Sequence, residues 1–350
     1  MMQLRSPVLA VLGLAVLGSC GVDPETEAAD KAAAVTQSGP RGMVPWRDNS
    51  QPRNTAAPAG AHLTYYGGRV NSATKVVMVL WGAGTTGSYE SHITSTATPS
   101  MLSFYNQVLG NGSTTTWLNS EYNTVSPTGT KTNQNIGVGT AGTQIYTITP
   151  SVTSATITDA QIQSEITAQI AAGNLPAKTY DAQGNATSYY AVFFPKGKTI
   201  TQGGSSSCVS GGFCAYHGTV GSGSTEYYYG VHPDMQAGSG CATGCGTAAT
   251  TFGNYTSVAS HELIEMITDP EVGLATVYGP PLAWYDQTNG EIGDICNAQQ
   301  GTYTGCDGQS YTIQLEFSNA QANCIGFPAP TCGPDFTIAS SPTSVTIAQG

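Results

Sequence analysis

The sequence predicts an α+β fold that is stabilised by disulfide bonds, and three observations support this prediction. Runs typical of strands, such as "KVVMVLWG" and "SYYAVFFP", share the chain with a segment of helical periodicity. Strands and helices do not alternate in the regular repeat that indicates a doubly wound sheet. Of nine cysteines, all but Cys20 follow residue 200, and an even number is typical of a disulfide framework in an exported protein.

The overall composition excludes one class of partner. The chain has 350 residues, which is enough to bury a large core, and only 9% of them are charged. This low charge is typical of exported, loop-rich proteins that contain β-structure. The formal net charge of −11 would repel a polyanion, so we expect no nucleic-acid partner.

The distribution of charge points to a bound cation. Every Lys and Arg lies at or before Lys198, whereas twelve Asp and Glu residues follow it. A carboxylate that leaves water needs a cationic partner, and in this half only a protonated histidine supplies one. Metal ions are the natural further candidates. The alternative is that most of these acids lie at the solvated surface.

The N-terminus predicts export. Arg5, an apolar run from Val8 to Leu17 and the sequence "LGSC" indicate a signal peptide of the lipoprotein type over residues 1–19. Cys20 would then carry a lipid anchor, the only membrane contact that we expect. An ordinary signal peptide, cut near Ser19 or Cys20, is the alternative. The protein is therefore expected at the bacterial cell surface, as an outer-membrane lipoprotein, or secreted.

Composition divides the rest of the chain into three parts. Residues 20–60 are rich in Ala, Pro, Ser and Gln without apolar periodicity, which predicts a flexible linker. Residues 61–330 form the predicted folded domain. Residues 331–350 resemble the opening strands of a β-sandwich repeat, which are too few to fold alone.

Within the domain, four runs predict strands and one predicts a helix. The strands are "LTYYGG", "KVVMVLWG", "SYYAVFFP" and "TEYYYGVH". The helix is "ITDAQIQSEITAQIAAGNLP", with Thr158 or Asp159 as its cap and Gly173 as its stop. The close spacing of the cysteines favours bonds between sequence neighbours, beginning with Cys208 and Cys214, although sequence alone leaves the connectivity open.

The segment "ASHELIEMITDPEVG", residues 259–273, is the most informative stretch. Thr256 or Ser257 can cap a helix that Pro270 ends, and His261 and Glu265 lie one turn apart on the same face. The pattern HExxE is a variant of the zincin motif HExxH, and zinc accepts carboxylate oxygen as well as imidazole nitrogen. Glu262 would be the general base that takes a proton from the attacking water. A surface helix with exposed acids is the alternative.

A third ligand is expected from "AWYDQTNGEIGDIC". Asn289-Gly290 predicts a two-residue hairpin turn, with Tyr285 opposite Asp294 and Asp286 opposite Gly293. Asp294 is our first choice. The alternatives are Glu291; Asp286, as a calcium ligand or a residue that orients a ligand; the histidines His217 and His232; and Glu271, which has the spacing of the third ligand in metzincins.

With these motifs in view, the chain resembles the phosphate-induced, EXORDIUM-like family, in particular its bacterial branch with a zincin-like motif. The resemblance covers about Ala61 to Phe327, and "SHELIEMITDP" with "GEIGDIC" is its most specific part. The resemblance implies the domain limits and export.

The sequence thus predicts an exported zinc metallopeptidase with a zincin-like domain, a mixed β-sheet and an active-site helix. His261, Glu265 and Asp294 would hold zinc, and Glu262 would act on a protein or peptide substrate, for example in the cell wall. The alternative is a non-catalytic extracellular or wall-associated binding module with a structural zinc or calcium ion.

Overall fold

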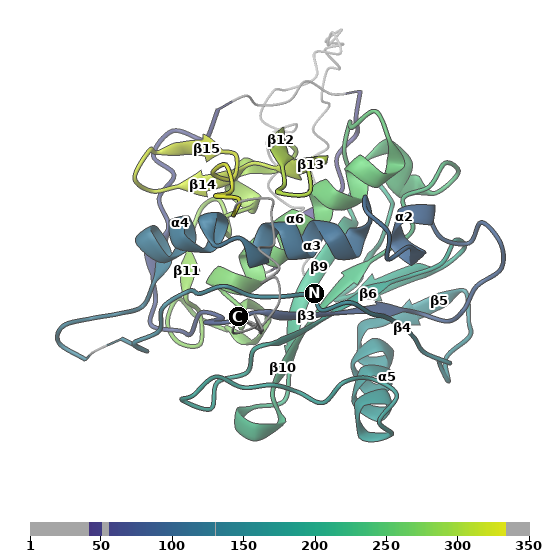
Figure 1. Ribbon diagram of the computed structural model, residues 1–350, viewed down its shortest axis with the longest axis horizontal. Helices are drawn as coiled ribbons and strands as arrows, with labels where there is room; N and C mark the ends of the chain where they lie inside the picture. The colour runs from purple at the N-terminus through teal and green to yellow at the C-terminus, as the bar shows by residue number, and fades with distance from the viewer. Residues whose placement is uncertain (1–41, 51–55, 130, 334–350) are drawn as a thin grey trace, which may run out of the picture. The chain divides into compact units, whose positions relative to one another are not determined.

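A six-stranded sheet organises the fold in the computed structural model, which describes residues 42–50, 56–129 and 131–333 (Figure 1). The strand order is β1-β9-β10-β6-β3-β4. Neighbours are parallel from β10 to β4, whereas β9 is antiparallel to both β10 and β1. The strands are β1 (Met43–Pro45), β3 (Lys75–Leu80), β4 (Ile145–Thr147), β6 (Ser188–Phe193), β9 (Phe213–Val220) and β10 (Tyr227–His232). The predicted α+β class with a mixed sheet is confirmed.

Helices cover both faces of this sheet. Side chains alternate along β3, so that Met78 and Leu80 enter one core while Val79 enters the other. The first core includes apolar residues of α3 (Met101–Gly110), α4 (Ser113–Tyr122) and α6 (Thr251–Thr268). The second includes Ile162 and Ile166 of α5 (Asp159–Ala171), and Figure 1 shows α5 and α6 on opposite sides of the sheet.

The remaining elements are short and form smaller sheets and turns around this framework. They are α2 (Ser91–Thr94), β2 (Thr64–Tyr65), β5 (Thr156–Thr158), β7 (Thr199–Gln202), β8 (Ser205–Ser206), β11 (Trp284–Tyr285), β12 (Gln300–Thr304), β13 (Ser310–Gln314), β14 (Glu316–Ser318), β15 (Asn323–Ile325), and the 3-10 turns η1 (Gly223–Thr225), η2 (Gly240–Thr243), η3 (Val272–Leu274) and η4 (Asp294–Cys296).

The local signals for α5 are realised in the structure. The Thr158 hydroxyl accepts a hydrogen bond from the Gln161 N–H, and the Gln161 side-chain oxygen accepts one from the Thr158 N–H, which completes a capping box. Gly173, with φ of +76°, follows the last turn, where residues with a side chain are disfavoured.

Helix α6 begins earlier than the sequence suggested. The cap is Thr250, whose hydroxyl accepts from the Gly253 N–H at 3.0 Å, rather than Thr256 or Ser257. Both of these residues are buried inside the helix, where a serine or threonine hydroxyl can bond to the carbonyl one turn back. The end before Pro270 is as expected.

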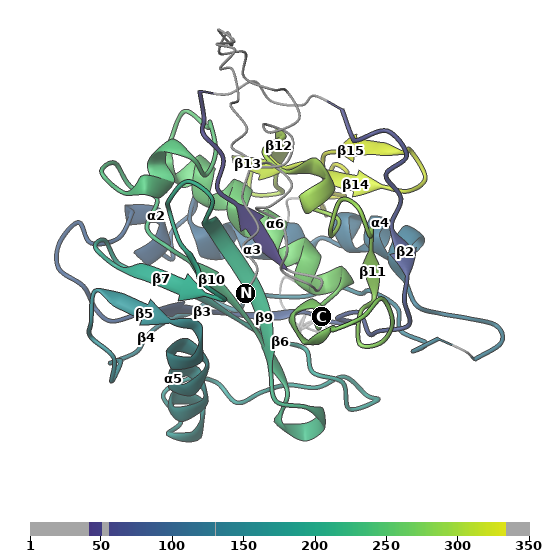
Figure 2. The ribbon, with the colours of Figure 1, turned by 180° about the vertical axis from the view of Figure 1, so that it is seen from behind.

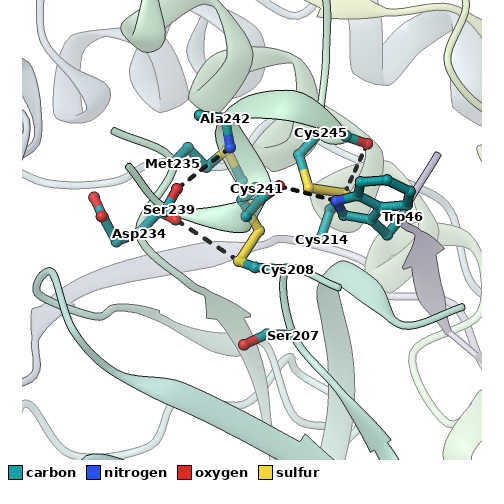
Figure 3. Close-up of a disulfide and its surroundings, with 12 residues drawn as sticks. Trp46, Ser207, Cys208, Cys214, Asp234, Met235, Ser239, Cys241, Ala242 and Cys245 are labelled. Carbon is teal, nitrogen blue, oxygen red and sulfur yellow. Dashed lines mark hydrogen bonds between the residues drawn. A yellow bond between two sulfur atoms is a disulfide. The ribbon is translucent and has the colours of Figure 1, made fainter. Parts of the chain in front are cut away.

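Four disulfide bonds are present, but sequence neighbours do not pair. The bonds are Cys208–Cys241, Cys214–Cys245, Cys296–Cys324 and Cys306–Cys332. Strand β10 returns antiparallel to β9 and brings the loop after it back to the start of β9, so the first two bonds join these segments (Figure 3). The predicted order was wrong because chain reversal, not spacing, sets which thiols meet.

The folded part begins before residue 61. The predicted signal peptide, the first part of the linker and nearly all of the C-terminal tail lie outside the described residues. Met43–Pro45, within the predicted linker, is strand β1 of the main sheet, alongside β9 in Figure 2. None of the helices among the described residues has the length and apolar character needed to cross a membrane.

Stability should fall in mild acid because of His232. This histidine at the end of β10 is fully buried, stacks on Phe193 at 4.7 Å, and neither ring nitrogen has a hydrogen-bond partner among the described residues. Burial lowers the pKa of His232 to about 3. The unfolded chain, with a His pKa of about 6.5, binds the proton more readily, so stability is complete above that pH and decreases as the pH falls toward 3.

The magnitude follows from about 1.4 kcal/mol per pH unit, so between pH 6.5 and pH 4 the loss is about 3 kcal/mol, a substantial part of a typical folding free energy of about 5–15 kcal/mol. We expect the free energy of unfolding to decrease between pH 7 and pH 4 by less in His232→Leu than in the wild type, as measured by urea denaturation. If the wild type and the variant lose the same free energy of unfolding between these pH values, His232 is not the cause.

Candidate metal site

Helix α6 carries the histidine and acids of the HExxE segment into the protein interior. His261, Glu262 and Glu265 are all 0% exposed, so the alternative of a solvated helix face is wrong. His261 Nε2 lies 2.9 Å from Glu265 Oε1, yet the ring nitrogen has no hydrogen bond of acceptable geometry. Two atoms that can bind a metal and that approach each other without a hydrogen bond are typical of ligands that share an ion.

Asp294 joins this pair from η4. Its Oδ1 lies 3.8 Å from His261 Nε2 and has no hydrogen-bond partner among the described residues. The three side chains offer donor atoms within 4.8 Å of one another. Ligands bound at 2.0–2.2 Å in a tetrahedral zinc site are separated by about 3.4 Å, which lies between the two observed distances.

The segment that carries Asp294 can approach α6 because Gly293 has no side chain. A Cβ atom there would lie 2.8 Å from His261 Nδ1 and 2.9 Å from Glu265 Oε1. The backbone N–H of Asp294 instead donates to Glu265 Oε1 at 3.0 Å. The Cys296–Cys324 bond ties down the end of η4. A backbone donor therefore orients the Glu265 carboxylate.

The predicted hairpin register is wrong. Asp286 and Gly290 exchange both backbone hydrogen bonds, and the chain enters η4 instead of a second strand. Gly290, with φ of +97°, supplies the turn. The carboxylate of Asp286 accepts from the N–H groups of His62, Thr288 and Asn289, so it closes this turn. Asp286 does not join His261, Glu265 and Asp294 as a possible metal ligand.

Glu265 also belongs to a second group of possible metal ligands, so that there are two donor groups, His261–Glu265–Asp294 and His217–Glu265–Glu291. His217 on β9 and Glu291 each offer an atom within 4.8 Å of the other and of Glu265. His217 Nε2 lies 3.7 Å from Glu291 Oε1, and His217 Nδ1 lies 3.8 Å from Glu265 Oε2. The same Nδ1 is 3.0 Å from Glu262 Oε2, within hydrogen-bond distance. Sequence analysis treated His217 and Glu291 as rivals for one site, whereas both lie beside it.

The other rival ligands have different partners. His232 stacks on Phe193 and belongs to neither donor group. Glu271 pairs with Arg69 at 2.7 Å, and the same guanidinium binds Glu226 at 2.6 Å. A basic residue from the first half therefore neutralises two acids of the second half, which corrects the expectation that only histidines or metals do so.

Around the two donor groups lie further buried acids that Arg69 does not reach. Glu316, on β14, is 0% exposed, and neither of its oxygens has a hydrogen-bond partner in the described part of the chain. It interacts electrostatically with His261, Glu265 and Asp294. Glu316 was not predicted as a site residue, because it lies 51 residues beyond Glu265 with no motif around it. Asp269 is also fully buried and has one unpartnered oxygen.

Burial and mutual repulsion dominate the titration of this cluster. Burial, with repulsion from neighbouring acids, raises the pKa of Glu291, Asp294 and Glu316 well above the usual range. Burial also raises the pKa of Glu262, against the opposing effect of the His217 hydrogen bond. Burial lowers the pKa of His261, but the nearby Glu265, Glu262 and Asp294 raise it well above its usual value overall. The cluster is an environment that favours cations.

Strand β1 covers the Glu262 side of the cluster. The Val44 N–H donates a long hydrogen bond of 3.4 Å to Glu262 Oε1, and Gly42 lies so close to the His217 ring that a Cβ would be 2.3 Å from its Cε1. Trp46 anchors the segment, because its indole Nε1 donates to the Gly240 carbonyl at 3.0 Å beside the Cys214–Cys245 bond (Figure 3). We call residues 42–46 the covering segment.

The comparisons with known proteins give no family for this chain. No protein-family model, no curated protein and no solved structure matches it.

Proposed function

We propose that this protein is an exported zinc-dependent peptidase or related amide hydrolase. The observation that carries the proposal is the convergence of the fully buried His261 and Glu265 with the mostly buried Asp294, directly beside Glu262. Among the described residues, no Lys or Arg forms an ion pair with them. One imidazole and two carboxylates are a donor set that zinc accepts, and three protein ligands leave a fourth position for water or substrate. The unpartnered nitrogen and oxygen atoms of His261 and Asp294 support the fit.

A bound zinc ion would supply a Lewis acid that polarises the substrate carbonyl and makes water more acidic. The chain itself supplies the proton acceptor. His217, within hydrogen-bond distance of Glu262 Oε2, orients the carboxylate that would accept the proton. Glu262 would accept the proton of the attacking water and pass it to the leaving amine.

Substrate access would require the covering segment to move. Asp294 is the only one of the three proposed ligands whose side chain is exposed, to 16%, whereas His261 and Glu265 are closed off. The covering segment pairs with β9, so an extended peptide that displaced it would meet the free backbone groups of the same strand. This arrangement supports a polypeptide substrate.

The same closure favours a second candidate function. A structural metal site has its coordination completed by protein, and complete burial of His261 and Glu265 is typical of such a site. The protein would then be an extracellular binding module whose domain depends on its metal for stability. The two functions differ in whether Glu262 is needed for turnover.

The first prediction concerns the general base. Glu262→Gln should reduce hydrolysis of a labelled unfolded protein by about 100-fold or more, because general-base catalysis typically contributes that factor. Zinc content, measured by elemental analysis, should not change, because Glu262 is not among the three ligands. Glu165→Gln, the same change at a buried acid of α5 on the other face of the sheet, is the control. Wild-type activity in Glu262→Gln would refute the mechanism, and a wild type that holds zinc without any turnover would favour the binding module.

The second prediction concerns the ligands. Replacing His261 and Glu265 together by Ala should abolish zinc binding. The wild type should lose thermal stability on chelation, because an ion that binds only the folded chain stabilises it by about 4 kcal/mol at a thousandfold excess over its Kd. Melting curves with and without chelator would test this. Zinc that survives the double change would exclude these residues as ligands.

The third prediction concerns the covering segment. Trp46→Ala removes the indole that seats it against Gly240, so hydrolysis should rise several-fold while zinc content stays constant. Trp46→Phe keeps an aromatic ring and loses only the N–H donor, so its activity should lie between that of the wild type and that of Trp46→Ala. Activity that falls in step with lost zinc would show instead that the covering segment supports the site.

A further inference from the structure

We propose that the cluster binds two divalent cations, with Glu265 as the carboxylate that bridges them. This inference rests on the proposed metal site and extends it. The first ion is the one held by His261, Glu265 and Asp294, and the second lies among His217, Glu291 and the other oxygen of Glu265.

The two oxygens of Glu265 face different histidines. Oε1 lies 2.9 Å from His261 Nε2, and Oε2 lies 3.8 Å from His217 Nδ1 with no hydrogen bond of its own. A carboxylate placed in this way presents one oxygen to each donor group. Bridging carboxylates of this kind are typical of two-metal sites, where the ions lie about 3.5–4 Å apart.

Glu291 is the second, independent indication. It is 0% exposed, and neither of its oxygens has a hydrogen-bond partner among the described residues. Among the described residues, the side chain that forms an ion-pair contact with it is His217, whose Nε2 lies 3.7 Å from Glu291 Oε1. Leaving a buried carboxylate unpaired costs several kcal/mol, which is a large part of the roughly 5–15 kcal/mol that stabilises a domain. A cation beside Glu291 would remove this penalty.

His217 has the arrangement of a metal ligand. Its Nδ1 lies within hydrogen-bond distance of Glu262 Oε2, and its Nε2 lies 3.4 Å from the Asp269 carbonyl oxygen and 3.7 Å from Glu291 Oε1. A neutral ring that donates from Nδ1 to Glu262 has its lone pair on Nε2, and an ion beside Glu291 would replace the long contact with that carbonyl. Histidines that bind metals commonly donate their other N–H to a carboxylate in this way. Glu262 would thus orient a ligand of the second ion and also lie beside the first.

The count of charges favours two ions over one. Glu262, Glu265, Glu291 and Asp294 form a buried group of four carboxylates. The ion pairs of Arg69 are with Glu226 and Glu271 instead. One divalent ion leaves two of these four charges uncompensated when both histidines are neutral ligands, and the buried Asp269 and Glu316 add to that excess. A second divalent ion would remove two more charges. One imidazole and two carboxylates suit zinc or manganese.

The test is the metal content of the full chain, loaded with zinc alone and freed of loosely bound ions. We expect two zinc ions per chain in the wild type, one in Glu291→Gln, one in Asp294→Asn and none in Glu265→Gln. Glu165→Gln should retain both. Loading with manganese gives a second readout, because two bridged ions broaden each other's electron paramagnetic resonance signal, and this broadening should be absent from Glu291→Gln.

The outcomes separate this inference from the proposed function. One zinc per chain that is lost in Asp294→Asn but kept in Glu291→Gln would overturn the second ion and leave the first intact. No zinc in the wild type would overturn both proposals. Two zinc ions that survive Glu291→Gln would place the second ion elsewhere and refute this site.

Discussion

The burial of acidic side chains without basic partners is the constraint on which the centre of this structure depends. Glu262, Glu265, Asp269, Glu291, Asp294 and Glu316 are collected from one helix, one turn and one short strand into an interior that also holds His217 and His261. An ordinary core would gain by replacing them with apolar residues. The cation that we propose would offset this cost, and it would link the folding and the chemistry of this domain through the same atoms.

Some parts of this arrangement followed from local sequence. Strand runs such as "KVVMVL" and "SYYAVF" occupy adjacent positions in the sheet, and the Thr158 capping box fixed the start of α5, because both depend on nearby residues alone. The spacing of His261 and Glu265 placed them on one helix face for the same reason. Asp294 was selected from its neighbourhood, and it does lie against this pair.

Other parts depended on distant contacts that no local pattern encodes. The disulfide pairs follow from the return of the chain along β10, and the true partner of Glu271 is Arg69, 202 residues earlier. Glu316 has an unremarkable sequence around it. The hairpin prediction around Asn289 failed because Asp286 accepts three backbone N–H groups and closes a tighter turn, after which a 3-10 turn carries Asp294 toward α6.

The position of β1 in the sheet has a consequence for the order of assembly. This strand comes from the N-terminal end of the described chain, yet everything that receives it lies far downstream: β9, and the loop closed by Cys241 and Cys245. In a chain that crosses a membrane with its N-terminus first, Met43–Pro45 cannot pair with β9 and contact this loop until residue 245 has followed. Strand β1 therefore cannot take its place before β9 is available, and until it does the side of the acidic cluster that it covers is open to ions in the surrounding medium.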